Sequence, residues 1–282
     1  MFTEILKNIR LFAFDLDGTL LDSQKKFSPR TLDALKEISS LGFKIVFASG
    51  RIKSSMQQYT QLCPFPVSIL SLNGAAVYLD QDHHFKKVYT ASLFSEYADY
   101  LIRHTENNSI TMNFYYNENL YVLLNETNLP WIELYTRQTG SKYHYLDSFQ
   151  SFLGISPSKI IFVGPPEILD VQQRFFSDLW GDSVYICRTW DYYLEFLNPL
   201  ANKGLGLSSI AEFFNLSMKN IVAFGDASND VPMLENAGYG IALNNASQDA
   251  KKAADRVSPW TNDDDAIMHE WASLKTLLNR NG

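Results

Sequence analysis

Two aspartates, Asp15 and Asp17, stand two positions apart in the segment Phe-Asp-Leu-Asp-Gly-Thr. They follow the short apolar run 11–14, which is typical of a strand buried on both faces. Residues two apart on a strand project to the same side, so we expect the two carboxylates to converge. Their repulsion is tolerable if a hard divalent cation with oxygen ligands lies there. Taken alone, the pair can also simply cap the next element.

The segment Ser49-Gly50-Arg51 follows a second apolar run, residues 43–48. A hydroxyl and free backbone N–H groups at the start of a helix can hold a phosphate oxygen. Ser49 is also a good helix N-cap, and for this segment alone that interpretation is favoured.

Two later segments carry similar chemistry. Lys203 stands just before a predicted helix, where a fixed ammonium could neutralise phosphate, although a lone lysine is usually a solvated surface residue. Asp226, Asn229 and Asp230 follow the apolar run 221–224 and form an oxygen-rich cluster. The same residue types dominate ordinary turns, so this cluster alone leaves both interpretations open.

The elements around these segments predict a parallel sheet that brings them together. Apolar strand-like runs alternate with helix-like stretches over the first 80 residues, and the alternation resumes after residue 199. Ligands of an open parallel sheet gather beyond the carboxyl ends of its strands, where all four segments are predicted. Between them, alternating strands and amphipathic helices predict an α+β insertion. We therefore expect a core at 1–83 and 199–282, interrupted by an insertion at 84–198.

Length and composition agree with two compact units in one folded chain of 282 residues. The net charge of −7 argues against a non-specific nucleic-acid or anionic-membrane binder, but it does not forbid an anionic substrate. Residues 1–10 carry no signal-peptide pattern, and no apolar run approaches the roughly 20 residues that span a bilayer. We expect the protein to stay in the cytoplasm.

Cysteines and histidines offer little chemistry in this sequence. Cys63 and Cys187 form no C-x-x-C pair, which predicts no zinc site and favours buried free thiols in a reducing compartment. His83 and His84 lie in a polar stretch that we interpret as a connection between strands, without a chemical role.

In this order, the four segments resemble those of the haloacid dehalogenase superfamily of phosphohydrolases. The insertion between the second and third motifs and the turn at 71–75, Ser-Leu-Asn-Gly-Ala, are similar to the Cof-like subfamily with its α/β cap. The resemblance covers nearly the whole chain. It implies an α/β fold with a Rossmann-like parallel sheet core and an inserted α+β cap domain.

The resemblance also implies a role for each matching residue. Asp15 would be the nucleophile that takes the phosphoryl group, and Asp17 the acid that protonates the leaving oxygen and then the base that activates water. Magnesium would bind the carboxylates of Asp15 and Asp226 and the backbone carbonyl of Asp17. Asp230 would support the metal's water shell and orient Lys203. The phosphoryl oxygens would be held by Ser49, Gly50, Lys203, Asn229 and the backbone N–H of Leu16.

The expected activity is magnesium-dependent hydrolysis of a small phosphorylated metabolite, a sugar phosphate or similar phosphomonoester. A phosphomutase or phosphotransferase on the same core remains an alternative, and a non-catalytic binding module is a weaker one because no motif residue has been lost. Asp17 disfavours a dehalogenase, which has no phosphate leaving group to protonate. We expect no nucleic-acid or membrane partner, and either a monomer or a homodimer.

The insertion is expected to act as a mobile lid that selects the substrate, with hinges near 80–84 and 198–201. Its aromatic residues could stack on a sugar or heteroaromatic ring, although such spacing more often marks a hydrophobic core. They are Phe114, Tyr115, Tyr116, Tyr121, Trp131, Tyr135, Tyr143 and Tyr145. Loop departures from the family pattern at 242–246 and 265–266 affect no catalytic role.

Overall fold

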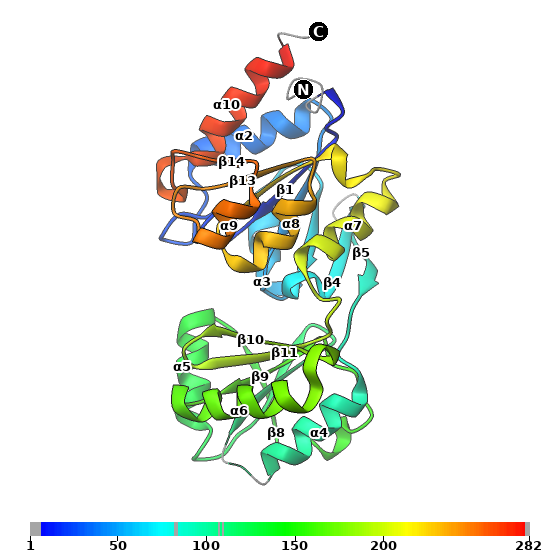
Figure 1. Ribbon diagram of the computed structural model, residues 1–282, viewed down its shortest axis with the longest axis vertical. Coiled ribbons are helices and arrows are strands. Elements are labelled where there is room, and N and C mark those ends of the chain that lie inside the picture. The colour runs from blue at the N-terminus through cyan, green and yellow to red at the C-terminus, as the bar shows by residue number, and fades with distance from the viewer. Residues whose placement is uncertain (1–6, 82–83, 107, 109, 280–282) are drawn as a thin grey trace. The chain divides into compact units, whose positions relative to one another are not determined.

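The computed structural model describes residues 7–81, 84–106, 108 and 110–279 (Figure 1). The chain divides into two compact units. The core unit comprises Met1–Tyr89 and Asn202–Gly282, and the inserted unit comprises Thr90–Ala201. Among the described helices, none is both long and apolar enough to cross a membrane.

The described part of the core unit contains an eight-stranded sheet in the order β14-β13-β12-β1-β2-β3-β4-β5. The strands are β1 Leu11–Asp15, β2 Lys44–Ala48, β3 Val67–Ser71, β4 Ala76–Gln81, β5 His84–Thr90, β12 Ile221–Gly225, β13 Tyr239–Ala242 and β14 Arg256–Val257. Neighbours from β14 to β3 are parallel, and β4 pairs antiparallel with β3. The carboxyl ends of β1, β2, β3 and β12 therefore lie along one edge.

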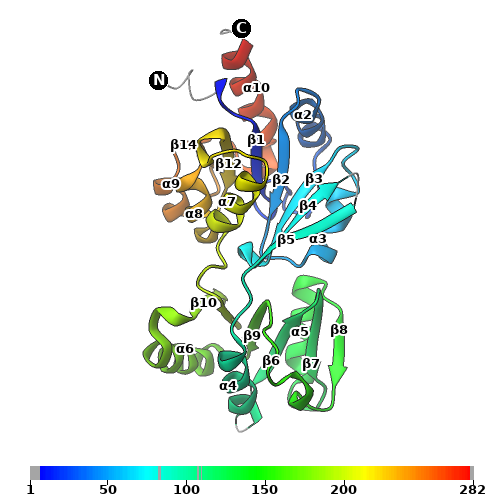
Figure 2. The same cartoon turned by 90° about the vertical axis from the view of Figure 1, so that its right-hand side faces the viewer.

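Helices cover both faces of this sheet (Figure 2). Phe12 and Phe14 of β1 pack with the helices of one face, whereas Leu11 and Ala13 pack with those of the other, as the alternation of a strand requires. The first face carries α2 Pro29–Ser40, α3 Lys53–Thr60 and α10 Ala266–Asn279. The second carries α7 Lys203–Phe213, α8 Val231–Asn236 and α9 Gln248–Ala253.

The inserted unit is built on a mixed, mostly antiparallel sheet in the order β10-β11-β9-β6-β7-β8. Its strands are β6 Thr111–Tyr116, β7 Asn119–Leu123, β8 Tyr143–Leu146, β9 Lys159–Val163, β10 Tyr185–Trp190 and β11 Tyr193–Leu197. Its helices are α4 Ser95–Glu106, α5 Leu129–Thr139 and α6 Pro166–Trp180.

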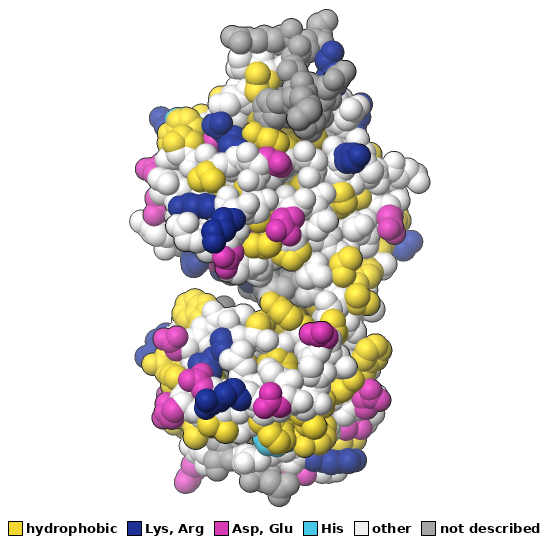
Figure 3. All heavy atoms as spheres, viewed as in Figure 1, with side chains coloured by type: hydrophobic (Ala, Val, Ile, Leu, Met, Phe, Trp, Pro, Cys, Tyr) yellow, Lys and Arg dark blue, Asp and Glu magenta, His cyan; other side chains and the backbone are white. Residues whose placement is uncertain are grey.

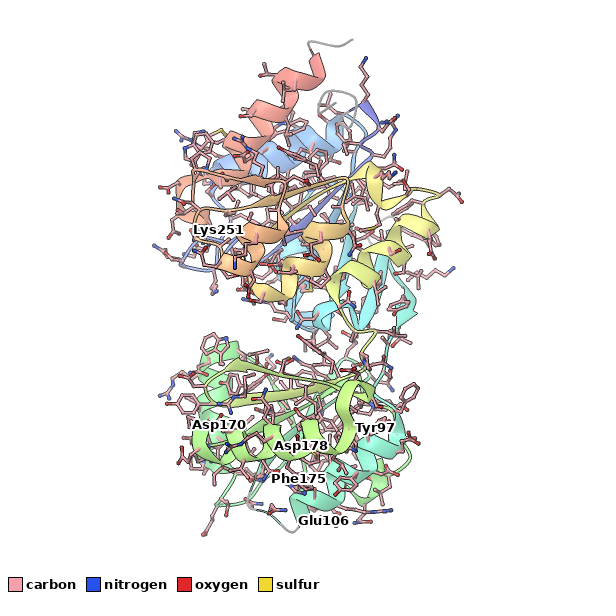
Figure 4. The ribbon with its side chains drawn as sticks, viewed as in Figure 1. Tyr97, Glu106, Asp170, Phe175, Asp178 and Lys251 are labelled. Carbon is pink, nitrogen blue, oxygen red and sulfur yellow. The ribbon has the colours of Figure 1, made fainter. Side chains whose placement is uncertain are left out.

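Helices α4 and α6 lie against one face of this sheet and share an aromatic cluster (Figure 4). The ring of Tyr97 on α4 meets Trp180 edge-on at a centroid distance of 5.1 Å, and His104 stacks on Phe175 of α6 at 5.8 Å. Offset and edge-on contacts of this kind stabilise packing beyond their buried area. The unit therefore has a hydrophobic core of its own.

Several polar groups are buried elsewhere in the inserted unit. Lys159 Nζ lies 3.0 Å from Glu195 Oε2, with both side chains almost fully buried. The hydroxyls of Tyr115 and Tyr135 are 2.5 Å apart, which ties α5 to β6. Of the aromatic residues considered above, Phe114, Tyr115 and Tyr135 are buried, so for these three the core interpretation is correct. Tyr145 is 57% exposed.

The predicted fold class is confirmed, with two local differences. The structural boundaries follow Tyr89 and Ala201, later than the expected ones at 83/84 and 198/199. The first boundary is later because β5 extends the core sheet, so His84 lies in a strand and not in a connection. His83 and part of the expected hinge at 80–84 lie outside the described residues.

Charged side chains of both signs lie on the surface, and both cysteines are unpaired. On the face seen in Figure 3, acidic and basic side chains are interspersed over both units. Both cysteines are free, and burial raises the pKa of each thiol to about 12. Cys63 is buried as predicted, whereas Cys187, on β10, is only partly buried.

Candidate active site

The four predicted segments meet at the carboxyl edge of the core sheet. β1 ends at Asp15, β2 ends directly before Ser49, and β12 ends directly before Asp226. β1 pairs with both β2 and β12, so these three ends are neighbours. Lys203 is the first residue of α7, whose preceding residue Asn202 caps the helix by accepting the N–H of Leu205.

Lys203, like Asp230, is a fully buried charged group of the cluster. Its Nζ lies 2.5 Å from Asp15 Oδ1 and 2.6 Å from Asp230 Oδ1, and its side chain is 0% exposed. Burial lowers the pKa of Lys203, but Asp15 and Asp230 outweigh burial and raise that pKa above its usual value. The lysine is therefore a fixed cation, and the interpretation as a solvated surface residue is wrong.

Asp230 organises the turn that follows β12. One of its carboxylate oxygens accepts the backbone N–H groups of Asp226 and Ala227, each at 3.0 Å, and the other accepts from Lys203. All of these partners lie within the site, and the side chain is fully buried. Asp230 thus shapes the acidic turn and holds Lys203 in place.

Asp15, Asp226 and Asp230 could together hold a metal ion, because one oxygen of each lies within 4.8 Å of the others. Burial raises the pKa of Asp15, Lys203 lowers it, and Asp230 and Asp226 raise it again, so that it stays well above its usual value. Burial and then Asp230 raise the pKa of Asp226 to about 6. Such crowding of carboxylates is what a divalent cation relieves.

The donor set fits a hard cation with oxygen ligands, such as magnesium. When ionised, the three aspartates carry three negative charges, and the ammonium of Lys203 offsets one of them. The two negative charges that remain would balance the two positive charges of the ion. The oxygens of Asp230 are already used by N–H groups and Lys203, so Asp15 and Asp226 are the better direct ligands. Thr19 Oγ1 donates to Asp226 Oδ1 at 2.8 Å and steadies that carboxylate.

The carboxylate of Asp17 is paired with cations and is not part of the cluster that Asp15, Asp226 and Asp230 form among the described residues. Arg51 binds it with two hydrogen bonds of 2.7 Å, and Lys25 Nζ lies 2.9 Å from Oδ1. Burial raises the pKa of Asp17, but Arg51 and Lys25 outweigh burial and lower it to about 2. β1 ends at Asp15 and the chain turns at Gly18, which has φ 88°, so Asp17 lies beyond the strand and the alternation of a strand does not fix the direction of its side chain.

Arg51 and Lys25 are therefore site residues that sequence reasoning left without a role. Arg51 stands inside the second motif, so its position was available as a signal. Lys25 lies in the turn that follows Asp22, and nothing in its sequence context marks it.

The remaining predicted residues line the same edge. Ser49 is buried, and its hydroxyl accepts the N–H of Arg51 at 3.2 Å. The residue that precedes α3 is Ile52, so the interpretation of Ser49 as the N-cap of that helix is wrong. Asn229 Nδ2 donates to Asn73 Oδ1 at 2.9 Å, and Asn73 packs over Gly50. Leu16 directly follows Asp15 and is buried.

Comparison with known proteins decides the family. The haloacid dehalogenase-like hydrolase family matches residues 12–270. The chain belongs to this family. Its predicted superfamily is confirmed, and it is an enzyme, a phosphatase of the haloacid dehalogenase type.

Three bacterial relatives are similar to this haloacid dehalogenase-like phosphatase over most of its length. It is 27% identical to the 5-amino-6-(5-phospho-D-ribitylamino)uracil phosphatase YitU of Bacillus subtilis, over 94% of this chain and 98% of the relative. It is 30% identical to a putative phosphatase of Buchnera aphidicola, over 92% and 93%. It is 27% identical to an HMP-PP phosphatase of Serratia proteamaculans, over 84% of each.

Two solved structures share the fold of this phosphatase. A haloacid dehalogenase-like hydrolase from Bacteroides thetaiotaomicron aligns with a TM-score of 0.84 at 25% identity, over 94% of this chain and 99% of the other. A protein from Thermotoga maritima aligns with a TM-score of 0.83 at 29% identity, over 94% and 97%. Both alignments include the inserted unit as well as the core.

Replacing Gly18 by Ala should displace the acidic turn of this phosphatase. A Cβ at Gly18 would stand 2.4 Å from Asp226 Oδ2, and the backbone there has φ +88°. Gly42 has nearly the same conformation, φ +86°, with nothing within 4 Å of an added Cβ. We expect both Gly→Ala variants to lose about 1–2 kcal/mol of stability from the left-handed backbone. Only Gly18→Ala should also lose activity, by about a hundredfold in kcat/KM.

Thermal melting and turnover of p-nitrophenyl phosphate with magnesium check this pair of variants. Equal activity of Gly18→Ala and Gly42→Ala would contradict the prediction, because it would mean that the site tolerates a shift of Asp226.

Proposed function

We propose that this phosphatase hydrolyses a small phosphorylated metabolite through an aspartyl phosphate on Asp15, with magnesium as its metal. The observation that carries the proposal is the buried contact of Asp15 with Lys203, beside the carboxylate of Asp226. A nucleophile held by a fixed cation next to a metal-binding carboxylate suits attack on a dianionic phosphate.

Asp15 is arranged to use its two oxygens differently. Oδ1 is held by Lys203, so Oδ2 is the oxygen available to attack phosphorus. As the new O–P bond forms, the ester P–O bond breaks and the leaving oxygen takes a proton from Asp17. Asp17 then removes a proton from a water molecule that attacks phosphorus, and the bond to Asp15 breaks to release inorganic phosphate.

The contacts of Asp17 bear on this cycle. Arg51 and Lys25 stabilise the ionised carboxylate, which suits the second step because an ionised Asp17 can accept a proton from water. In the first step Asp17 must carry a proton, so its pairing with Arg51 has to weaken when the phosphate ester binds. The pairing with Arg51 is thus a point where substrate binding and proton transfer are linked.

Positive charge and N–H donors surround the position of the phosphoryl group in this proposal. When bound, magnesium supplies charge that lets a dianionic phosphate approach the carboxylates. The carboxylates of Asp15 and Asp226 and the backbone carbonyl of Asp17 would hold it. Fixed donors aimed at the developing charge usually provide the largest part of such catalysis. The donors assigned to the phosphoryl oxygens are Ser49, Gly50, Lys203 and Asn229, together with the backbone N–H of Leu16.

The relatives support the substrate class and the reaction type. Two of them are named for phosphorylated small molecules, a phosphoribitylamino-uracil and HMP-PP, and all three are named as phosphatases. This favours a sugar phosphate or similar phosphomonoester as substrate, and hydrolysis over transfer to a second acceptor.

Asp15→Asn should abolish turnover while the fold is kept, because the amide has the shape of the carboxylate but cannot attack phosphorus. We expect kcat to fall by about 10⁴-fold or more, as when a covalent nucleophile is removed. Asp178→Asn, an exposed change on α6 of the inserted unit, is the matched control and should be fully active (Figure 4). Retained activity in a clean preparation of Asp15→Asn would contradict the mechanism.

Removal of divalent metal should stop the reaction, since the clustered carboxylates otherwise repel a phosphate dianion. Turnover of p-nitrophenyl phosphate is measured before and after treatment with excess EDTA, and again after dialysis into magnesium. We expect loss of activity with EDTA and recovery with magnesium. Full turnover in EDTA would falsify the assignment of a metal.

The inserted unit is assigned to substrate choice, because every residue with a proposed chemical role belongs to the core unit. Trp131 and Tyr116, both partly exposed, are the residues to replace one at a time by Ala. Each variant should change the ranking of substrates in a panel of phosphorylated metabolites more than it changes turnover of p-nitrophenyl phosphate. If one such substitution eliminated activity toward every phosphate ester in a folded protein, the inserted unit would hold a catalytic group.

A further inference from the structure

The turn between β3 and β4 has an unusual backbone. Leu72, Asn73 and Gly74 form a tight turn in which all three residues have positive φ, at 52°, 56° and 98°. Glycine adopts this region freely and asparagine tolerates it, but for leucine it costs about 1–2 kcal/mol. Residues in such conformations persist only where their surroundings hold them, and they concentrate at functional sites.

This turn contacts three of the four motif segments. The N–H of Asn73 donates to the carbonyl of Ser49, and that of Leu72 to the carbonyl of Arg51, both at 3.0 Å. A Cβ on Gly74 would lie 2.2 Å from the carbonyl oxygen of Asn202, so the turn approaches the residue before Lys203 as closely as only glycine permits. The turn therefore braces the second and third motifs against each other.

The contact with the fourth motif comes through the side chain of Asn73. Its Oδ1 accepts from Asn229 Nδ2 at 2.9 Å, and an ideal Cβ at Gly50 would lie 3.1 Å from the same oxygen. An amide nitrogen carries two N–H groups. One of those of Asn229 points to Asn73, so the direction of the other is determined by this bond.

We propose that Asn73 is a positioning residue that orients the amide of Asn229 toward a phosphoryl oxygen. The inference rests on the phosphatase mechanism proposed above and adds a fifth segment to its four. Asn73 is 8% exposed and needs no contact with substrate for this role. It acts by removing the rotational freedom of the Asn229 amide, which would otherwise have to be lost when the phosphate binds.

A purely structural role for Asn73 predicts something different. Asparagine is tolerated in the left-handed region, so its only task could be to allow the turn. Glycine performs that task at least as well. Asn73→Gly therefore separates the two roles, because it keeps the backbone conformation and removes the side chain that holds Asn229.

Asn215 provides the matched control. It has φ 53°, close to the 56° of Asn73, and is exposed in the turn after α7. Asn215→Gly makes the same chemical change at a residue with a similar backbone conformation in the core unit. Among the hydrogen bonds of the described residues, the Asn215 side chain has none to the motif segments. Asn215→Gly should melt like the wild type, whereas Asn73→Gly loses a buried side chain with its hydrogen bond and should melt a few degrees lower while staying folded at the assay temperature.

The test is a double-mutant cycle on kcat/KM for p-nitrophenyl phosphate with magnesium. We expect Asn73→Gly to lower kcat/KM by about ten- to a hundredfold and Asn215→Gly to change it by less than about twofold. In an Asn229→Ala background, Asn73→Gly should cost less than about threefold, because the residue through which Asn73 acts is gone. An undiminished cost in that background, or no cost in the wild-type background, overturns the proposal.

Two further outcomes are distinguishable. If Asn73→Gly fails to fold, Asn73→Asp replaces it, since a carboxylate keeps the acceptor for Asn229. We expect that variant to keep kcat within about threefold while its added charge raises KM. A fall in kcat of about tenfold or more in a folded Asn73→Asp protein overturns the inference.

Failure of the proposed function and failure of this inference give different results. If the wild type shows no magnesium-dependent turnover, the proposed function fails, and the inference fails with it. If the wild type is active and Asn73→Gly is equally active, only the inference is refuted.

Discussion

The buried ammonium of Lys203 is the group on which the rest of the site depends. Taking such a cation out of water costs several kcal/mol, and the cost is offset only where carboxylates and good geometry surround the charge. Asp15 and Asp230 provide that surrounding at 2.5 and 2.6 Å. Removing either carboxylate would leave a buried charge short of a partner, so the nucleophile, the lysine and the turn after β12 form one interdependent set.

The same set explains how acidic groups can crowd at one edge of a sheet in a protein of net charge −7. Local charge, and not the charge of the distant surface, governs a cleft with low-dielectric walls. Lys203 compensates part of the carboxylate charge of Asp15, Asp226 and Asp230, and the excess that remains matches a divalent ion. Arg51 and Lys25 form a second, separate group of cations around Asp17. Asp15 and Asp17, only two residues apart in the first motif, thus lie in different electrostatic environments.

Much of this arrangement was predictable from the sequence because it follows from strand ends. Buried strands that stop at Asp15, Ser49 and Asp226 predict neighbours at one edge once the sheet is parallel, and the structure has that sheet. Lys203 was predictable only together with the other motifs, since its own context is that of an ordinary surface lysine. The partners of Asp17 were not predictable, because they depend on how the turn after Gly18 directs the side chain. The strand β5 was missed because its largely exposed, polar sequence reads as a connection.

The order of the strands in the core sheet has a consequence for synthesis of the chain. β1 lies between β2, which follows it closely in sequence, and β12, whose residues 221–225 come after the whole inserted unit. While the ribosome makes residues 90–201, β1 has only one of its two neighbours, and its other edge presents unpaired N–H and C=O groups beside Phe12 and Phe14. Exposed apolar strand edges are templates for aggregation. The inserted unit, with a hydrophobic core of its own, can fold during this interval, but it also prolongs the interval. Its length thus sets how long the nascent central strand stays open to other chains.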